Sequence, residues 1–321
     1  MQILKLFKDT YKSWDANDPW AKSAMIAYYA LFSLPSVLII TIHFAGVFFG
    51  EDAVQGRITH EIEGLIGTSS AELLQAIIIN SALSTNSTFF IIVGIGTLIF
   101  GASGVFVQLQ KALNDIWGVR LKKSGIMTTV KHRAIAFGMV LVIGLLMLIS
   151  LIISTLISAF SDFIGSYYVS LPAWLIQVIN FVVSQIIITA LFATIFTMLP
   201  DVKVRWRTNV FGAAMTTLLF LIGKYAIGIY FAKTDPASAY GAAGSVVLIL
   251  LWVYYTCLIL FFGAEFTVNW ALYKNIKIEP GEHAAPSYEQ EIEELRKYKE
   301  QVEERRKKSE QLCGWEERKQ S

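Results

Sequence analysis

Three ionisable side chains, His43, Lys224 and Glu265, lie within apolar stretches that are long enough to cross a bilayer. A charge near the bilayer centre costs roughly 2.5–3.5 kcal/mol on insertion scales, so each of these residues is a candidate functional group. Lys224 could hold an anionic headgroup, or it could extend along its own stem to reach water. Glu265 could carry protons. The residue types therefore point to chemistry inside a membrane.

The two charges Lys224 and Glu265 are expected at different depths. At 1.5 Å per helical residue, Lys224 lies roughly 24 Å from the basic end of its stretch, and Glu265 lies roughly 12 Å from the same side. A direct ion pair between them is therefore not expected. Glu265 is expected to meet Lys22, Arg205 or Arg207, or the end of another helix.

Polar side chains share helical faces with these charges on three consecutive apolar stretches. Such faces could line a hydrated internal cavity, or they could join the helices by hydrogen bonds. Both interpretations stay open. The members are Thr217 and Gly228 with Lys224, Tyr254 and Asn269 with Glu265, and the stripe Gln177, Asn180 and Ser184 with Gln185 beside it.

Catalytic and metal-binding patterns are not found. The four histidines, His43, His60, His132 and His283, are scattered, and none has a second histidine at ligand spacing. A Walker motif is also missing, so the chain is not expected to hydrolyse ATP itself. We expect no metal, no cofactor and no enzyme activity.

The positioning elements are six apolar stretches. The chain is 55% hydrophobic and 16% charged, outside the usual range of a soluble domain. A membrane helix needs roughly 20 apolar residues, and the alternating pattern of a β-barrel is missing. The sequence predicts an all-α integral membrane protein, a bundle of six transmembrane helices. The spans are about 24–50, 89–107, 134–160, 174–199, 208–232 and 244–272.

Basic residues sit almost wholly on one side of these spans. The loops between spans one and two, three and four, and five and six hold only Arg57 and Lys233. The positive-inside rule then places both termini in the cytoplasm. The residues on that side include Lys5, Lys8, Lys12, Lys22, Lys111, Arg120, Lys122, Lys123, Lys131, Arg133, Lys203, Arg205, Arg207, Lys274 and Lys277.

Three segments follow from this division. Residues 1–22 form an amphipathic helix, 23–272 the membrane domain with an outer helical loop at 51–88, and 273–321 a charged cytoplasmic tail expected to be helical. In the first segment, an apolar face predicts a helix either lying on the inner leaflet or packed under the bundle. That face consists of Leu4, Phe7, Tyr11 and Trp14.

Four residues are structural or gating candidates. Pro35 should kink span one, as a static bend or as a hinge. Gly101 and Gly104 suit close helix packing more than a substrate contact. Trp117 should lie at headgroup level, on the apolar side of a segment that bends along the inner interface.

Four stretches, in order along the chain, resemble the YihY/BrkB family of bacterial inner-membrane proteins. They are residues 27–35 (AYYALFSLP), 110–119 (QKALNDIWGV), 199–207 (LPDVKVRWR) and 240–265, which ends in GAE. The likeness covers about residues 15–272. It implies a six-helix protein of the bacterial cytoplasmic membrane with both termini inside.

The resemblance does not imply one settled activity. Some members are labelled virulence factors, and some are suspected of moving lipids or envelope precursors. An older label is ribonuclease BN, a transfer-RNA-processing enzyme. The scattered histidines and short cytoplasmic loops speak against that label, so no nucleic-acid partner is expected.

Two functions remain. The leading hypothesis is a transporter, or a translocator of lipids or envelope precursors, without its own ATPase and with membrane lipids as partners. The alternative is a scaffold that does not transport and acts on the envelope through partners held by its tail. The sequence is compatible with a homo-oligomer and leaves the substrate, direction and coupling ion open.

Overall fold

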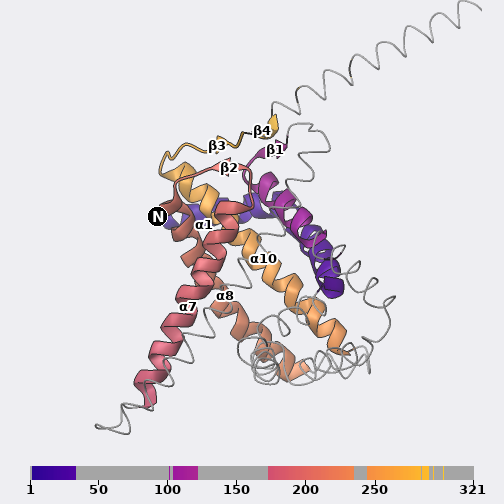
Figure 1. Cartoon of the computed structure of the whole chain (residues 1–321), viewed down its shortest axis with the longest axis vertical. Helices are drawn as coiled ribbons and strands as arrows, with labels where there is room; N and C mark the ends of the chain where they lie inside the picture. Colours follow the sequence, from indigo (N-terminus) through magenta and orange to yellow (C-terminus); the bar gives the residue numbers. More distant parts are fainter. Residues whose placement is uncertain are drawn as a thin grey trace, which may run out of the picture.

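The computed structural model describes residues 2–33, 101, 104–121, 173–234, 244–282, 284–288, 292 and 299. The outer loop 51–88, most of spans one to three, Pro35 and His43 lie outside these residues. The expected helical architecture is found in the described part (Figure 1). Its helices are α1 (Gln2–Ala16), α7 (Ala173–Met198), α8 (Trp206–Thr234), α10 (Gly244–Tyr273) and the helical stretches 19–33 and 104–116.

Three of the described helices, α7, α8 and α10, are long and apolar enough to cross a membrane. They contain 26, 29 and 30 residues, which at 1.5 Å per residue gives roughly 39–45 Å, more than a hydrocarbon core of about 30 Å. Their bounds differ by two residues or fewer from the stretches 174–199, 208–232 and 244–272. Helices form because lipid offers the backbone no other hydrogen-bond partner.

Helices α8 and α10 are antiparallel and meet along a seam of small residues. Gly212 on α8 faces Thr267 on α10, and Thr216 on α8 faces Gly263 on α10, so each glycine receives a threonine. Each threonine hydroxyl donates to the carbonyl of the glycine four residues earlier, at 2.8 Å for Thr216 and 2.7 Å for Thr267. Small residues allow this close approach without lost hydrogen bonds.

Four short strands close one end of the bundle, which we call the base. β1 (Val119–Leu121) pairs antiparallel with β4 (Ala284–Pro286), and β2 (Val202–Lys203) pairs antiparallel with β3 (Glu279–Pro280). In Figure 1 the strands and α1 gather at the same end of the long helices. The segment 274–288 is here called the strap. Its strand β4 pairs with the loop that follows the 104–116 helix, and its strand β3 pairs with the loop that follows α7. Within the tail expected to be helical, residues 279–280 and 284–286 form strands, and residues 287 and 288 are helical.

Helix α1 packs against α10, the second of the two arrangements expected for it. Its buried residues are Leu6, Thr10 and Trp14, whereas Leu4 is 81% exposed and Tyr11 is also exposed. The apolar face is therefore divided, with Trp14 on the bundle and Leu4 and Tyr11 outside. The next helix starts at residue 19, so residues 1–22 contain a break rather than one continuous helix.

Candidate functional site at the base

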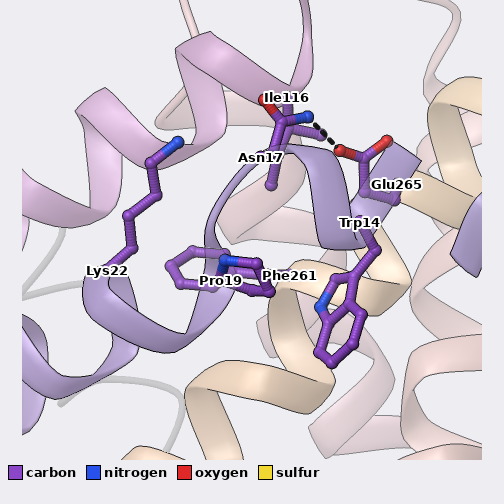
Figure 2. Close-up of a pocket in the computed structure, with 7 residues that line it drawn as sticks. All are labelled: Trp14, Asn17, Pro19, Lys22, Ile116, Phe261 and Glu265. Atoms are coloured by element: carbon purple, nitrogen blue, oxygen red, sulfur yellow. Dashed lines mark hydrogen bonds between the residues drawn. The ribbon is translucent and has the colours of Figure 1, made fainter. Parts of the chain in front are cut away.

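Glu265 is buried at the base, inside a candidate membrane span. Its side chain is 2% exposed, and its carboxylate accepts a hydrogen bond of 2.5 Å from the side-chain amide of Asn17. Figure 2 shows the two groups pointing at each other from α10 and from the turn after α1. A buried carboxylate is costly unless a donor compensates for its lost hydration, and Asn17 supplies such a donor.

The turn that presents Asn17 has a simple local cause. Asp18 adopts a φ of 48°, the left-handed region that Asn and Asp tolerate better than most residues. Pro19 then opens the next helix, where its fixed φ suits the first position. The Asp18 carboxylate accepts a 3.5 Å hydrogen bond from the backbone N–H of Ala21, as an N-cap does. Asn17 is thereby held between two helices.

Apolar side chains surround the polar pair. Trp14, Pro19, Ile116 and Phe261 line a small pocket with Asn17, Lys22 and Glu265, and the pocket is too narrow to admit a water molecule. The indole N–H of Trp14 donates to the backbone carbonyl of Leu258 at 3.3 Å, which fixes α1 on α10. The pocket is thus a tight crevice where four helices meet, namely α1, the helices 19–33 and 104–116, and α10.

An ion pair borders this crevice. The Lys22 ammonium lies 2.7 Å from a carboxylate oxygen of Asp115 at the end of the 104–116 helix. Lys22 therefore shares the pocket of Glu265, but its ammonium pairs with Asp115. Figure 2 shows the Lys22 side chain extending away from the Glu265 carboxylate. Arg205 and Arg207, the other bases considered for Glu265, are exposed. We call Asn17, Lys22, Asp115 and Glu265 the base junction.

Asp201 joins the neighbouring loop to the same helix and to the strap. Its carboxylate accepts from Asn114 at 2.9 Å and from Gln110 at 3.1 Å, and its backbone N–H donates to the Asn114 side chain at 2.8 Å. Its carbonyl accepts from the N–H of Gly281 in the strap at 2.7 Å. Two adjacent residues of the 104–116 helix thus have different partners: Asn114 binds the loop at Asp201, and Asp115 binds Lys22.

Sequence reasoning missed Asn17, Asn114, Asp115 and Asp201 as members of the site. Only the Asn17-Asp18-Pro19 run carried a local signal, because Asp before Pro favours a helix break. Their side-chain partners lie between 87 and 248 residues away along the chain, and the pair Lys22–Asp115 falls within this range.

The remaining candidate residues are dispersed. Lys224 is half-buried on α8 beside Gly223, which packs against Tyr255 and Ile259 of α10. Since Ile259 lies six residues, or roughly 9 Å, from Glu265 along α10, the structure does not bring Lys224 and Glu265 together.

Several predicted polar residues bond within or between helices. The Thr217 hydroxyl lies 3.0 Å from that of Thr189 on α7, and Thr189 also donates to the carbonyl of Gln185 at 2.7 Å. Asn269 donates to the carbonyl of Glu265 at 3.0 Å. Tyr254 is partly buried against the apolar core, and the side chain of Asn180 lies outside the described residues. In these places the polar groups join helices.

The glycine candidates lie at a helix contact. A Cβ on Gly101 would sit 3.0 Å from Ser33, and one on Gly104 would overlap the ring of Tyr29. Trp117 is 4% exposed, so it packs inside the base, and its expected place at headgroup level stays a prediction. It belongs to the same buried cluster as Val119 and Ala284, since the strap covers this end of the helix.

A metal centre is not formed by the part of the chain that the structure describes, because no three His, Cys, Asp or Glu side chains are grouped there. Long apolar helices with a buried glutamate near one end are typical of an integral membrane protein. The chain belongs to the family described as virulence factor BrkB, whose model matches residues 10–287.

Relatives carry two kinds of name. A ribonuclease-like protein of Bacillus subtilis, YfkH, is 23% identical over 86% of this chain and 98% of its own length. A UPF0761 membrane protein of Alcanivorax borkumensis is 29% identical over 76% of this chain and 55% of its own. Another UPF0761 membrane protein, from Idiomarina loihiensis, is 26% identical over 61% of this chain and 66% of its own length. The chain thus spans about half to two thirds of these two membrane proteins. No solved structure matches it.

Proposed function

We propose that this protein is a translocator of lipids or envelope precursors in the bacterial cytoplasmic membrane, with six spans and both termini in the cytoplasm. It has no ATPase and is not an enzyme, so transport is downhill or coupled to a gradient. In this proposal the base junction is the cytoplasmic closure of the pathway. Glu265 is its charged group, and the turn at Asn17 is the part that covers it.

The observation that carries the proposal is the burial of Glu265 within an apolar span. An ionisable group at that place is costly and is therefore retained for function more often than for stability. Its donor Asn17 comes from outside the spans, on a turn joined to α10 by few polar contacts. A cover of this kind can separate from the carboxylate without unfolding a transmembrane helix.

The orientation rests on charge. In the described residues, the base carries Lys22, Lys111 and Arg205, while Lys233 lies at the opposite end of α8. Helices α7 and α10 run towards the base and α8 runs away from it, as alternating spans require. Basic residues favour the cytoplasmic side.

The first test separates charge from packing. Glu265→Gln keeps an oxygen that accepts from Asn17 but removes the ionisable group. The wild-type protein and the variant are reconstituted in liposomes, and transbilayer movement of a fluorescent phosphatidylethanolamine is followed by dithionite quenching. Loss of movement in Glu265→Gln, at equal incorporation and equal thermal stability, supports the proposal. Equal movement in both proteins, together with a protein-free rate that is clearly lower, removes Glu265 from the mechanism.

Native mass spectrometry of gently purified protein searches for the cargo. A lipid or precursor retained by the wild type and lost from the Lys224→Ala, Glu265→Ala double variant supports an internal binding site. Bulk phospholipid bound equally by both proteins counts against it.

A scaffold function is the second candidate, and the strap favours it. The strap is attached to two separate loops, because β4 pairs with β1 and β3 pairs with β2. A partner bound to the tail would therefore be coupled to the bundle. A truncation after Tyr288 keeps both strand pairs and removes only the tail beyond. Under the scaffold hypothesis this truncation abolishes function, whereas under the translocator hypothesis it is mild.

A further inference from the structure

A second site lies on the outside of the base, where α8 begins and α10 ends. The ring of Phe211 on α8 stacks on Trp270 of α10, with centroids 4.6 Å apart. Because the helices are antiparallel, Arg207 lies one turn nearer the base on α8, and Lys274, the first residue after α10, lies four residues beyond Trp270 towards the base. The same register that pairs the glycines and threonines of the seam therefore sets Arg207 opposite Lys274.

Aromatic residues place this basic pair at the edge of the membrane. Trp206 is 67% exposed at the start of one candidate span, and Tyr273 is exposed at the end of another. Exposed Trp and Tyr at span ends are typical of the headgroup level. The Lys274 ammonium lies 5.0 Å from the ring centre of Trp270 and 5.7 Å from that of Tyr273, so cation–π contacts hold its stem against the helix.

In the part of the chain that the structure describes, no carboxylate pairs with either of these two cations. Arg207 and Lys274 are both exposed, and within the described residues neither forms an ion pair. The first turn of α8 contains no acidic residue. The nearest described carboxylate in the strap sequence, Glu279, is engaged by Lys277 at 2.9 Å.

The end of α10 keeps Lys274 in this position. Asn275 adopts a φ of 52°, and the N–H of Ile276 donates to the carbonyl of Ala271 at 2.8 Å. This left-handed cap follows the end of α10 at Tyr273, so Lys274 is the capping residue between the helix and the turn into the strap. Lys274 therefore stays on the helix surface beside α8 instead of following the strap.

We propose that Arg207 and Lys274 bind the phosphate of an acidic phospholipid, with the lipid's glycerol and upper acyl chains against Phe211 and Trp270. Two cations at headgroup level above an apolar aromatic pair complement a lipid that is anionic at one end and apolar at the other. The site is separate from the base junction, and its test does not depend on transport.

The test measures lipid binding to the full-length protein in detergent. Native mass spectrometry titrates phosphatidylglycerol and, in parallel, phosphatidylcholine. The double variant Arg207→Gln, Lys274→Gln is compared with Lys111→Gln, Lys233→Gln, which removes the same charge from exposed positions elsewhere. A charge-retaining variant, Arg207→Lys with Lys274→Arg, should keep the affinity for phosphatidylglycerol if the lipid recognises the positive charge of the pair.

The expected loss in the Arg207, Lys274 double variant is about thirty-fold in apparent affinity for phosphatidylglycerol, with phosphatidylcholine unaffected. The matched control should lose less than about threefold, since diffuse attraction to distant charges is screened. A large excess of inorganic phosphate should leave lipid binding intact. Equal losses in the two double variants overturn the site. Displacement by phosphate alone overturns the lipid as its ligand.

Discussion

The seam between α8 and α10 makes a sharp prediction about Gly212. In Gly212→Ala the new methyl group would overlap the Thr267 hydroxyl and lie 2.7 Å from its Cβ and 2.8 Å from its Cγ2. Carbon atoms attract best at about 3.5–4.0 Å, so the helices must separate by roughly 1 Å. Thr267 cannot rotate away freely, because it is fully buried and its hydroxyl is bonded to Gly263.

The magnitude follows from two opposing terms. Overpacking of this kind costs about 1–3 kcal/mol. Replacing a helical glycine by alanine contributes up to about 1 kcal/mol in the opposite direction. Gly228→Ala on the same helix shares only the second term, because a methyl there meets nothing within 4 Å. The difference between the two variants therefore isolates packing, at about 1–3 kcal/mol.

The assay is thermal unfolding of purified protein in one detergent, monitored by the folded fraction that remains after heating. At about 2–4 °C per kcal/mol, Gly212→Ala should unfold roughly 2–12 °C below Gly228→Ala. Adding Thr267→Ala to Gly212→Ala should restore part of the loss, since two of the three clashing atoms are removed. A Gly212→Ala protein as stable as Gly228→Ala would refute the close contact and the register built on it.

Three further predictions concern the base. Asn114→Ala should lower the free energy of unfolding by about 1–3 kcal/mol, because it removes a buried partner of the Asp201 loop, and chemical unfolding in detergent measures the loss. Glu279→Gln should leave the melting midpoint unchanged at neutral pH, because the pair with Lys277 is exposed to solvent. Truncation after Tyr288 should leave the midpoint near that of the wild type, whereas truncation after Tyr273 should lower it by several degrees, since only the second removes β3 and β4.

The contribution of the Glu279–Lys277 pair to stability should also depend on pH in a defined direction. The hydrogen bond and charge of Lys277 lower the pKa of Glu279 below its usual range. The pair is therefore present at neutral pH and is lost only as the pH falls through that lowered pKa. A midpoint difference between wild type and Glu279→Gln that grows as the pH rises well above neutral would contradict this. For Asn114, the control is Lys111→Gln on the exposed side of the same helix, which should change little.

The long helices were predictable because a membrane span is a local property. About twenty apolar residues flanked by polar ones are enough, and α7, α8 and α10 end within two residues of the expected limits. The strands were not predictable for the opposite reason. β2 and β3 contain two residues each, too few for a period, and they exist only because each meets the other across the chain.

The candidate site was predictable in part. An acid in an apolar span is visible in the sequence, so Glu265 could be selected. Its partner could not, because a helix wheel gives the faces of α1 but not which face meets α10. From apolarity alone, Leu4 and Tyr11 were expected on the packed face of α1. In the structure the buried residues of this helix are instead Leu6 and Thr10, together with Trp14. Lipid-facing and protein-facing sides are both apolar in such a helix, so periodicity cannot separate them.

The strap has a consequence for the order of events during synthesis. Val119 of β1 leaves the ribosome 167 residues (286 minus 119) before its partner Pro286. At about 5–20 residues per second, the first strand waits roughly 8–33 s for the second. During that interval α7, α8 and α10 are synthesised, and the base cannot be closed until the strap follows them. Pairing of β4 with β1 therefore marks a chain that has been synthesised as far as the strap. A chain that ends earlier keeps an unpaired strand edge, which is accessible to the proteases that remove unfinished proteins.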